Sequence, residues 1–223
     1  MDFTYKTMSF NQFQSMMLKW MFKGVLCSAI SSLFMIVTGI IKMLSFAFIP
    51  MAIILGIIEI VMVIILVHKI ADIDMNKAKF YFYLYSIMNG ITLSFILSAI
   101  HPMVGVLVFG ITSAYFGLLY SITQFIKSDV SLIGRVCMSM LPVLVISYII
   151  LFFIQLPALY YATILIDLVV FSGLTIYDFK MTRQLYEESH DDNIECNALL
   201  CALQLYLDFI NIFLDIVMLV ADN

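Results

Sequence analysis

Charged residues are scarce in this chain, and their scarcity excludes an ordinary water-soluble domain. Only 12% of the 223 residues are charged, 64% are hydrophobic, and the mean hydropathy is +1.09. Soluble domains carry roughly 25% charged residues, and a soluble core of this length could not bury so many apolar side chains. We therefore expect lipid to be the solvent for most of the chain.

Three further absences narrow the class of protein. The short alternating segments of about ten residues that form β-barrel spans are missing, which leaves helices as the membrane-spanning structure. The four cysteines, Cys27, Cys137, Cys196 and Cys201, form no paired extracellular framework, so we expect no disulfides. Cys196 and Cys201 with His190 lack the second ligand pair of a zinc site, and we predict neither a resident metal nor a cofactor.

Apolar runs between charged residues, prolines and glycines predict seven helical spans. Each run is long enough, at about 1.5 Å per residue, to cross a hydrocarbon core of roughly 30 Å. The predicted spans are 24–43, 48–67, 80–100, 103–126, 132–154, 158–179 and 199–220. No soluble domain or linker interrupts them, so residues 1–223 are predicted to form one all-α transmembrane domain. A six-span chain with a re-entrant last segment is the alternative.

Basic residues indicate the orientation of the spans. All Lys and Arg residues except Lys42 fall on one side of the predicted bundle, which is therefore predicted to be cytoplasmic. The amino terminus would lie in the cytoplasm and the carboxyl terminus outside. The compact loops favour a bacterial cytoplasmic membrane over a eukaryotic endomembrane. The polar stretch 180–197 is predicted to be a solvated loop. The alternative is that its acidic residues form a pore entrance that attracts calcium weakly.

Five acidic residues lie inside the predicted spans, where an unpaired charge costs roughly 2.5 to 3.5 kcal/mol. They are Glu59, Asp167, Asp178, Asp208 and Asp215. None has a basic partner within its own span, so each needs a proton, a hydrogen bond from another helix, or a cation. A single buried Asp can also serve only to hold helices together, and Asp215 could reach interface water from near the end of its span.

Helical spacing places several of these acids on shared faces. In the last span, Gln204, Asp208, Asn211 and Asp215 follow one another at intervals of four, three and four residues, which forms one narrow stripe. Such a stripe faces protein or water rather than lipid.

The sixth span has a similar face. Asp167 and Asp178 are about three turns apart, and Phe171 and Leu174 lie between them. Because the sixth and seventh spans run in opposite directions, Asp178 and Asp208 are predicted to meet in the inner half of the bilayer. Two carboxyl groups at hydrogen-bond distance in low dielectric cannot both ionise readily, so the pair is expected to share a proton. Loss of that proton would leave like charges that separate the helices or recruit a cation.

Four motifs are similar to those of a known family. They are Gly173-Leu-Thr-Ile-Tyr177-Asp178, Ala202-Leu-Gln-Leu-Tyr206-Leu-Asp208-Phe-Ile-Asn211, Asn89-Gly90-Ile-Thr92-Leu-Ser94, and Asp129-Val-Ser131-Leu-Ile-Gly134-Arg135. The sequence resembles the Bax inhibitor-1, or transmembrane Bax inhibitor motif, family over most of its length. The resemblance implies a seven-helix bundle whose C-terminal helix is wrapped by the other six. It also implies a di-aspartyl pH sensor at Asp178 and Asp208, and calcium leak across the membrane.

The resemblance also implies roles for residues of the second span. In bacterial members an acid in this span helps cations to enter, and Glu59 fits that position. A basic residue near the inner end of the span pairs with the sensor in those members, and this chain offers His68 or Lys69 there. The link from Asp178 to Asp208 is longer here than in typical bacterial members, so the counter-charge of the pair is left open.

These observations predict a pH-sensitive calcium leak channel rather than an enzyme. Asp178 and Asp208 form the gate and hold calcium transiently. The predicted ion pathway includes Glu59, Asp167, Asp215 and Asn211. Phe171 and Leu174 are the candidate apolar plug. The expected partners are the lipid bilayer, calcium ions and protons; no nucleic acid is expected, and no protein partner can be named.

Two other functions use the same acids. A proton-coupled cation antiporter would alternate protons and cations on them, although transporters often show inverted repeats and none is detected. An intramembrane aspartyl protease would also need two aspartates in neighbouring spans. However, Leu205-Tyr206-Leu207 precedes the second acid instead of Gly-x-Gly, and Pro157-Ala158-Leu159 comes before both acids.

Overall fold

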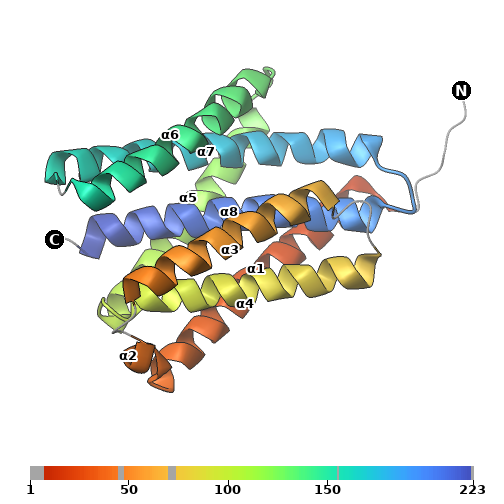
Figure 1. Ribbon diagram of the computed structural model, residues 1–223. Coiled ribbons are helices and arrows are strands. Elements are labelled where there is room, and N and C mark those ends of the chain that lie inside the picture. Colours follow the sequence, from red (N-terminus) through yellow and green to blue (C-terminus); the bar gives the residue numbers. More distant parts are fainter. Residues whose placement is uncertain (1–7, 45–47, 70–73, 155, 222–223) are drawn as a thin grey trace, which may run out of the picture. The chain divides into compact units, whose positions relative to one another are not determined.

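Every regular element in the described part of the chain is a helix (Figure 1). The computed structural model describes residues 8–44, 48–69, 74–154 and 156–221, apart from the side chains of residues 44, 48–53, 68 and 69. The helices are α1 (Phe10–Val37), α2 (Ile40–Leu44), α3 (Phe48–Lys69), α4 (Met75–Leu97), α5 (Pro102–Phe125), α6 (Ser131–Phe153), α7 (Pro157–Glu188) and α8 (Ile194–Ala221).

The helices have the length and composition of membrane spans. Within the described residues, α1 and α4 to α8 are six helices long and apolar enough to cross a membrane. Helix α3 contains 22 residues, and its described side chains form a further apolar stretch, Ile54–Val67. The predicted seven-helix membrane protein is therefore confirmed.

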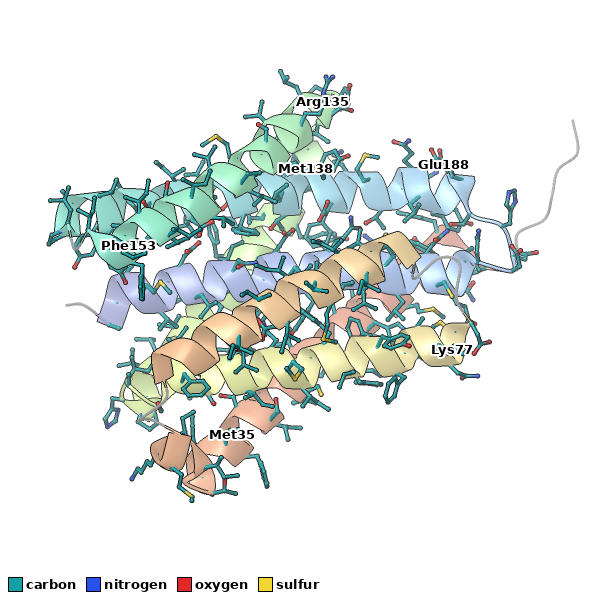
Figure 2. The ribbon with its side chains drawn as sticks, viewed as in Figure 1. Met35, Lys77, Arg135, Met138, Phe153 and Glu188 are labelled. Carbon is teal, nitrogen blue, oxygen red and sulfur yellow. The ribbon has the colours of Figure 1, made fainter. Side chains whose placement is uncertain are left out.

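Large apolar side chains cover the surface of the helices. Val37, Phe125 and Phe153 are 74%, 83% and 76% exposed, respectively. Figure 2 shows Arg135 near the start of α6 and Phe153 at its end, so the charged residue of this helix lies at one terminus. Such a surface would be unfavourable in water, whereas lipid tails solvate it.

The first helix differs from the predicted span 24–43. Helix α1 begins at Phe10 because Ser9 caps it: the Ser9 hydroxyl accepts from the Gln12 backbone N–H, and the Gln12 side chain accepts from the Ser9 N–H at 2.8 Å. The helix ends at Val37. Gly39 then adopts a φ of 73°, which is a left-handed conformation favourable for glycine, and α2 starts as a separate short helix.

The predicted polar loop 180–197 is also wrong in extent. Helix α7 continues to Glu188, and α8 begins at Ile194. Side-chain pairs one turn apart support the extension: the Arg183 Nε donates to Glu187 at 2.6 Å, and the Gln184 amide donates to Glu188 at 2.7 Å. The sequence predicted a loop here because the stretch is polar and highly charged, although its charged residues are spaced as helix neighbours.

The chain forms two compact units. The first contains Met1–His101 and Arg183–Tyr206, and the second contains Pro102–Thr182 and Leu207–Asn223. Helices α7 and α8 therefore contribute to both units. Of the six long helices, α8 has the largest buried share of its apolar stretch, 56%, against 11% for α6. The C-terminal helix thus supplies core residues along most of its length.

Within the first unit, α1 and α4 approach each other at Gly90. A β-carbon at this position would overlap the Ser31 hydroxyl and the Ser28 backbone. Small residues allow such close approach of helices in membranes, where packing and hydrogen bonds drive association. This contact places the neighbouring Asn89 in the core, where it is 6% exposed.

Candidate functional site

Tyr206 of α8 forms the centre of a hydrogen-bond network in the first unit. The side chain is fully buried, and its hydroxyl lies 2.6 Å from the Ser28 Oγ and donates to the Asn89 Oδ1 at 3.0 Å. The Ser28 hydroxyl is also within 2.8 Å of the Ser86 carbonyl oxygen. The network joins α1, α4 and α8, and the Tyr206 hydroxyl has partners on both sides. The sequence marked Asn89 and Tyr206 only as members of family motifs and assigned no role to Ser28 or Ser86.

Glu59 of α3 is tied to α4 in the same unit. The Thr92 hydroxyl donates to the Glu59 Oε1 at 2.6 Å, and Asn89 is a further hydrogen-bonding neighbour of this carboxyl group. Glu59 was predicted as an ion-pathway residue, and the structure gives it a specific partner that the sequence did not indicate. The candidate counter-charges His68 and Lys69 have side chains outside the described part of the chain.

The second unit contains the predicted carboxyl pair. Asp178 of α7 and Asp208 of α8 interact electrostatically, so the structure brings these two residues together. Asp208 is 4% exposed, and its Oδ2 has no hydrogen-bond partner. In the described part of the chain, neither carboxyl group makes an ion pair. Burial of two acidic groups without a basic partner is costly unless a proton or a cation compensates.

Two glycines of the sequence motifs allow α6 to pack against α7 beside this pair. A β-carbon at Gly134 would overlap the Tyr177 ring, and one at Gly173 would lie 2.5 Å from the Cys137 Sγ. Cys137 also interacts electrostatically with Asp208. The motif glycines therefore let α6 approach α7 closely beside Asp178, with Cys137 near Asp208. The sequence marked these positions, but it did not reveal which ring or thiol they accommodate.

A second carboxyl pair lies elsewhere along the same two helices. Asp167 of α7 and Asp215 of α8 are 7% and 3% exposed and interact electrostatically. The Tyr148 hydroxyl of α6 donates to the Asp167 Oδ2 at 2.6 Å. The Asp167 Oδ1 and the Asp215 Oδ2 are buried without a partner. The interpretation that Asp215 reaches interface water is therefore wrong, because the surrounding helices cover it.

Antiparallel helix geometry could have predicted this second pair. Residues that precede Asp178 on α7 must lie beside residues that follow Asp208 on α8. Asp167 and Asp215 satisfy that condition, since they are three and two turns away from the first pair, respectively. Sequence reasoning recognised both faces but joined them only at Asp178 and Asp208.

The remaining predicted residues occupy nearby positions. Leu174 is 6% exposed. It clusters with Val170 of its own helix and with Leu144 of α6, and Phe171 packs against this cluster. The Asn211 side-chain amide donates to the Leu207 carbonyl oxygen of its own helix at 2.8 Å. The structure thus places the candidate plug residues in contact with α6, and it gives Asn211 a local hydrogen bond.

The four aspartates of α7 and α8 occur in two pairs rather than in a larger cluster. Among the described residues, no group of three or more His, Cys, Asp or Glu side chains is placed to hold a metal ion. A pair of carboxyl groups can share a proton or hold a passing cation weakly. Both outcomes change the charge between α7 and α8.

Known proteins are similar to this chain over most of its length. The sequence profile of a family described as inhibitor of apoptosis-promoting Bax1 matches residues 10–223. The inner membrane protein YbhL of Escherichia coli K12 is 30% identical over 198 residues, which cover 87% of this chain and 85% of that protein. A Deinococcus radiodurans protein is 34% identical over 131 residues, 58% of this chain and 57% of its own. A membrane protein of Streptococcus pyogenes serotype M6 is 31% identical over 142 residues, 64% of this chain and 62% of its own.

Proposed function

This chain belongs to the Bax inhibitor-1 family of membrane proteins, and we propose that it is a pH-sensitive calcium leak channel gated by Asp178 and Asp208. The observation that carries the proposal is the pairing of these two carboxyl groups between α7 and α8 without a described basic partner. The family is not a known enzyme family, and the proposal includes no catalytic step.

The surroundings of Asp208 support a shared proton in the closed state. Thr175 is a hydrogen-bonding neighbour of Asp208, and its hydroxyl donates to the Phe171 carbonyl oxygen at 2.7 Å. A threonine hydroxyl has one proton, and the hydrogen bond to Phe171 uses it, so that proton is not available to an ionised Asp208. Ionised Asp208 would instead compete with Phe171 for the threonine proton.

Loss of the proton opens the channel in this mechanism. Two ionised carboxylates in a site with little water repel each other, and the repulsion favours a packing in which α7 and α8 are less closely joined. A difference of a few kcal/mol between closed and open packings is sufficient, because each 1.4 kcal/mol changes their ratio about tenfold. Phe171 and Leu174 would be the apolar residues displaced, and calcium would bind transiently to the freed carboxylates.

The other buried acids would form the route for cations. Glu59 would attract cations in the first unit, and Asp167 with Asp215 would provide a second acidic step in the other unit. Asn211 would add a polar group between Asp208 and Asp215 on α8. We place the channel in a bacterial cytoplasmic membrane, with the amino terminus in the cytoplasm, because of the basic-residue distribution and the bacterial relatives.

A calcium flux titration tests this proposal. Purified protein is reconstituted in vesicles loaded with a calcium-sensitive dye, and flux is measured against pH. Wild-type flux should rise with pH, while Asp178→Asn and Asp208→Asn should lose that dependence because the single remaining carboxyl group has no second carboxylate to repel. Asp129→Asn is the matched control, since Asp129 is an exposed carboxyl of the same unit. An unchanged pH response in both variants would exclude Asp178 and Asp208 as the pH-sensitive gate.

The second carboxyl pair favours one alternative, a proton-coupled cation antiporter. Asp167 and Asp215 provide a second site at a different position along α7 and α8, and an antiporter requires sites that exchange protons for cations. The same vesicles distinguish the two functions. An antiporter would give saturable calcium flux driven by an imposed proton gradient, whereas a leak channel would follow the calcium gradient alone.

A further inference from the structure

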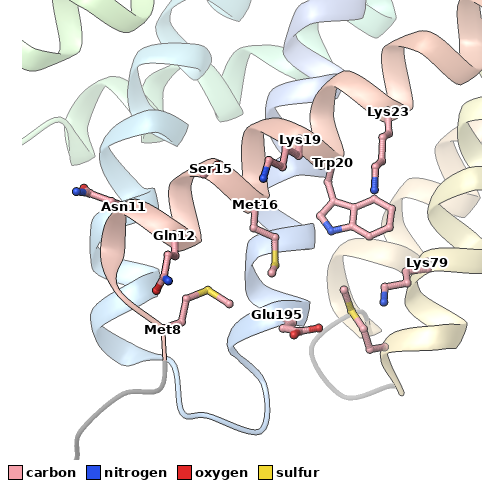
Figure 3. Close-up of a pocket in the computed structure, with 11 residues that line it drawn as sticks. Met8, Asn11, Gln12, Ser15, Met16, Lys19, Trp20, Lys23, Lys79 and Glu195 are labelled. Atoms are coloured by element: carbon pink, nitrogen blue, oxygen red, sulfur yellow. The ribbon is translucent and has the colours of Figure 1, made fainter.

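The first unit contains a basic pocket of about 670 Å³ that the channel mechanism does not use (Figure 3). Lys19 and Lys23 of α1 and Lys79 of α4 line it, and Glu195 of α8 is the carboxylate among the described lining residues. Three ammonium groups against one carboxylate leave the pocket with a positive excess. An anion is therefore the ligand that its charge favours.

Two of the lysines converge on one aromatic ring. The Lys23 Nζ lies 4.2 Å from the centre of the Trp20 ring, and the Lys79 Nζ lies 5.8 Å from it. Figure 3 shows these side chains reaching toward Trp20 from two different helices. Among the described residues, none of the pocket lysines makes an ion pair with Glu195 or any other acid. A bound anion would offset the repulsion between the two ammonium groups.

The sequence places these lysines at the level of lipid headgroups. Lys23 directly precedes Gly24–Val37, and Lys79 directly precedes Phe80–Leu97, and neither stretch contains a charged residue. Charged ends of spans lie at the interface between lipid and water, and tryptophan is enriched at the same depth. The anionic groups available at that depth are the phosphates of membrane lipids.

An adjacent hollow distinguishes a lipid from free phosphate. It shares Lys19 and Lys23 with the basic pocket and is also lined by Leu18 and Phe22, which are 39% and 65% exposed. Apolar surface beside ammonium groups suits a molecule that has both a phosphate and acyl chains. We propose that the pocket binds the phosphate headgroup of an anionic membrane lipid, with an acyl chain along Leu18 and Phe22. This site does not depend on the proposed channel function.

Tryptophan fluorescence provides a direct test, because Trp20 is the one tryptophan of the chain. Purified full-length protein in neutral detergent is titrated with short-chain phosphatidylglycerol, short-chain phosphatidylcholine or inorganic phosphate. The proposal predicts a saturable change with phosphatidylglycerol and much weaker responses to the other two. An equal response to inorganic phosphate would assign the pocket to free phosphate, and a missing response to phosphatidylglycerol would overturn the proposal.

Charge variants show whether the lysines are responsible. Lys23→Gln combined with Lys79→Gln should weaken phosphatidylglycerol binding roughly 30-fold, since each basic residue near a lipid surface contributes roughly a fivefold change in affinity. Lys77→Gln is the matched control, because Lys77 lies on α4 outside the pocket. Native mass spectrometry of the same proteins counts the retained lipids independently. Unchanged binding and lipid retention in the double variant would contradict the assignment.

Discussion

The buried polar groups of α8 differ between its two halves in whether they have hydrogen-bond partners. In the first unit, the Tyr206 hydroxyl has hydrogen-bond partners on α1 and α4. In the second unit, Asp208 and Asp215 each keep a buried oxygen without a partner. Both halves lie in one apolar helix, so the difference does not come from its general composition.

This difference separates polar groups that stabilise the fold from groups that are able to change state. A buried polar network with all partners present fixes one arrangement of helices. A buried carboxyl without a partner gains from any event that supplies a proton or a cation. The second half of α8 is therefore where we expect responses to pH and calcium, and the first half is where we expect stability.

The largest expected effect is a difference in stability between two substitutions on α8, one at Tyr206 and one at Asp208. Tyr206→Phe should destabilise the protein by about 1–3 kcal/mol, because Ser28 and Asn89 would keep buried polar groups that lose a partner. Asp208→Asn should change stability by less than about 1 kcal/mol, since its Oδ2 has no partner to lose and the neutral amide, like a protonated carboxyl group, places no second charge beside Asp178. Unfolding of the purified variants in detergent micelles measures both. Equal losses would show that the two halves do not differ.

A smaller effect is expected where a carboxyl group has a partner. Glu59→Gln keeps an oxygen that accepts from Thr92, so stability should fall by less than about 1 kcal/mol, while calcium flux should fall up to about tenfold as the attraction for cations is lost. Thr92→Val is the matched variant that keeps the carboxyl group and loses the hydroxyl. It should lower stability and leave flux close to wild type; the reverse pattern would assign Glu59 to packing.

The smallest effect concerns Asp129, an exposed carboxyl between α5 and α6. The Ser131 hydroxyl donates to it at 2.5 Å and the Ser131 backbone N–H at 2.9 Å, and these hydrogen bonds lower the pKa of Asp129. A lowered pKa contributes stability above the ordinary Asp pKa of about 3.9, and the contribution is lost as pH falls through the folded-state value. Asp129→Asn should therefore unfold at a slightly lower temperature at neutral pH, with no difference in strong acid. A difference that persists in acid would exclude the charge as its cause.

Much of the fold was predictable because membrane helices are specified by long apolar runs. The positions of α3, α5 and α6 follow those runs closely. The starts of α1 and α4 depend instead on the Ser9 and Asp74 caps, and the end of α7 on pairs such as Arg183 with Glu187. Such local signals are weak beside hydropathy. Prediction from apolar runs alone therefore misplaces the ends of helices that extend beyond the lipid.

The candidate site was only partly predictable for a different reason. Helical periodicity reveals which acids share a face, and so it predicted that Asp178 and Asp208 would meet. It does not reveal the rotation of a neighbouring helix, so the pairings of Tyr148 with Asp167 and of Thr92 with Glu59 were not found. Contacts between helices depend on packing details such as the close approach at Gly134.

Infrared difference spectroscopy tests most directly whether Asp178 and Asp208 share a proton that leaves as pH rises. A protonated carboxyl group has a carbonyl stretch that disappears on ionisation, and the spectrum is recorded on protein in lipid across a pH titration. The account predicts that this band decreases over the same pH range in which calcium flux rises, and that the component titrating in that range is lost from it in Asp178→Asn and Asp208→Asn, because the remaining carboxyl group no longer has a charged neighbour. A carboxyl spectrum whose whole pH titration is the same in wild type and in both variants, with no component assignable to Asp178 and Asp208, would contradict it.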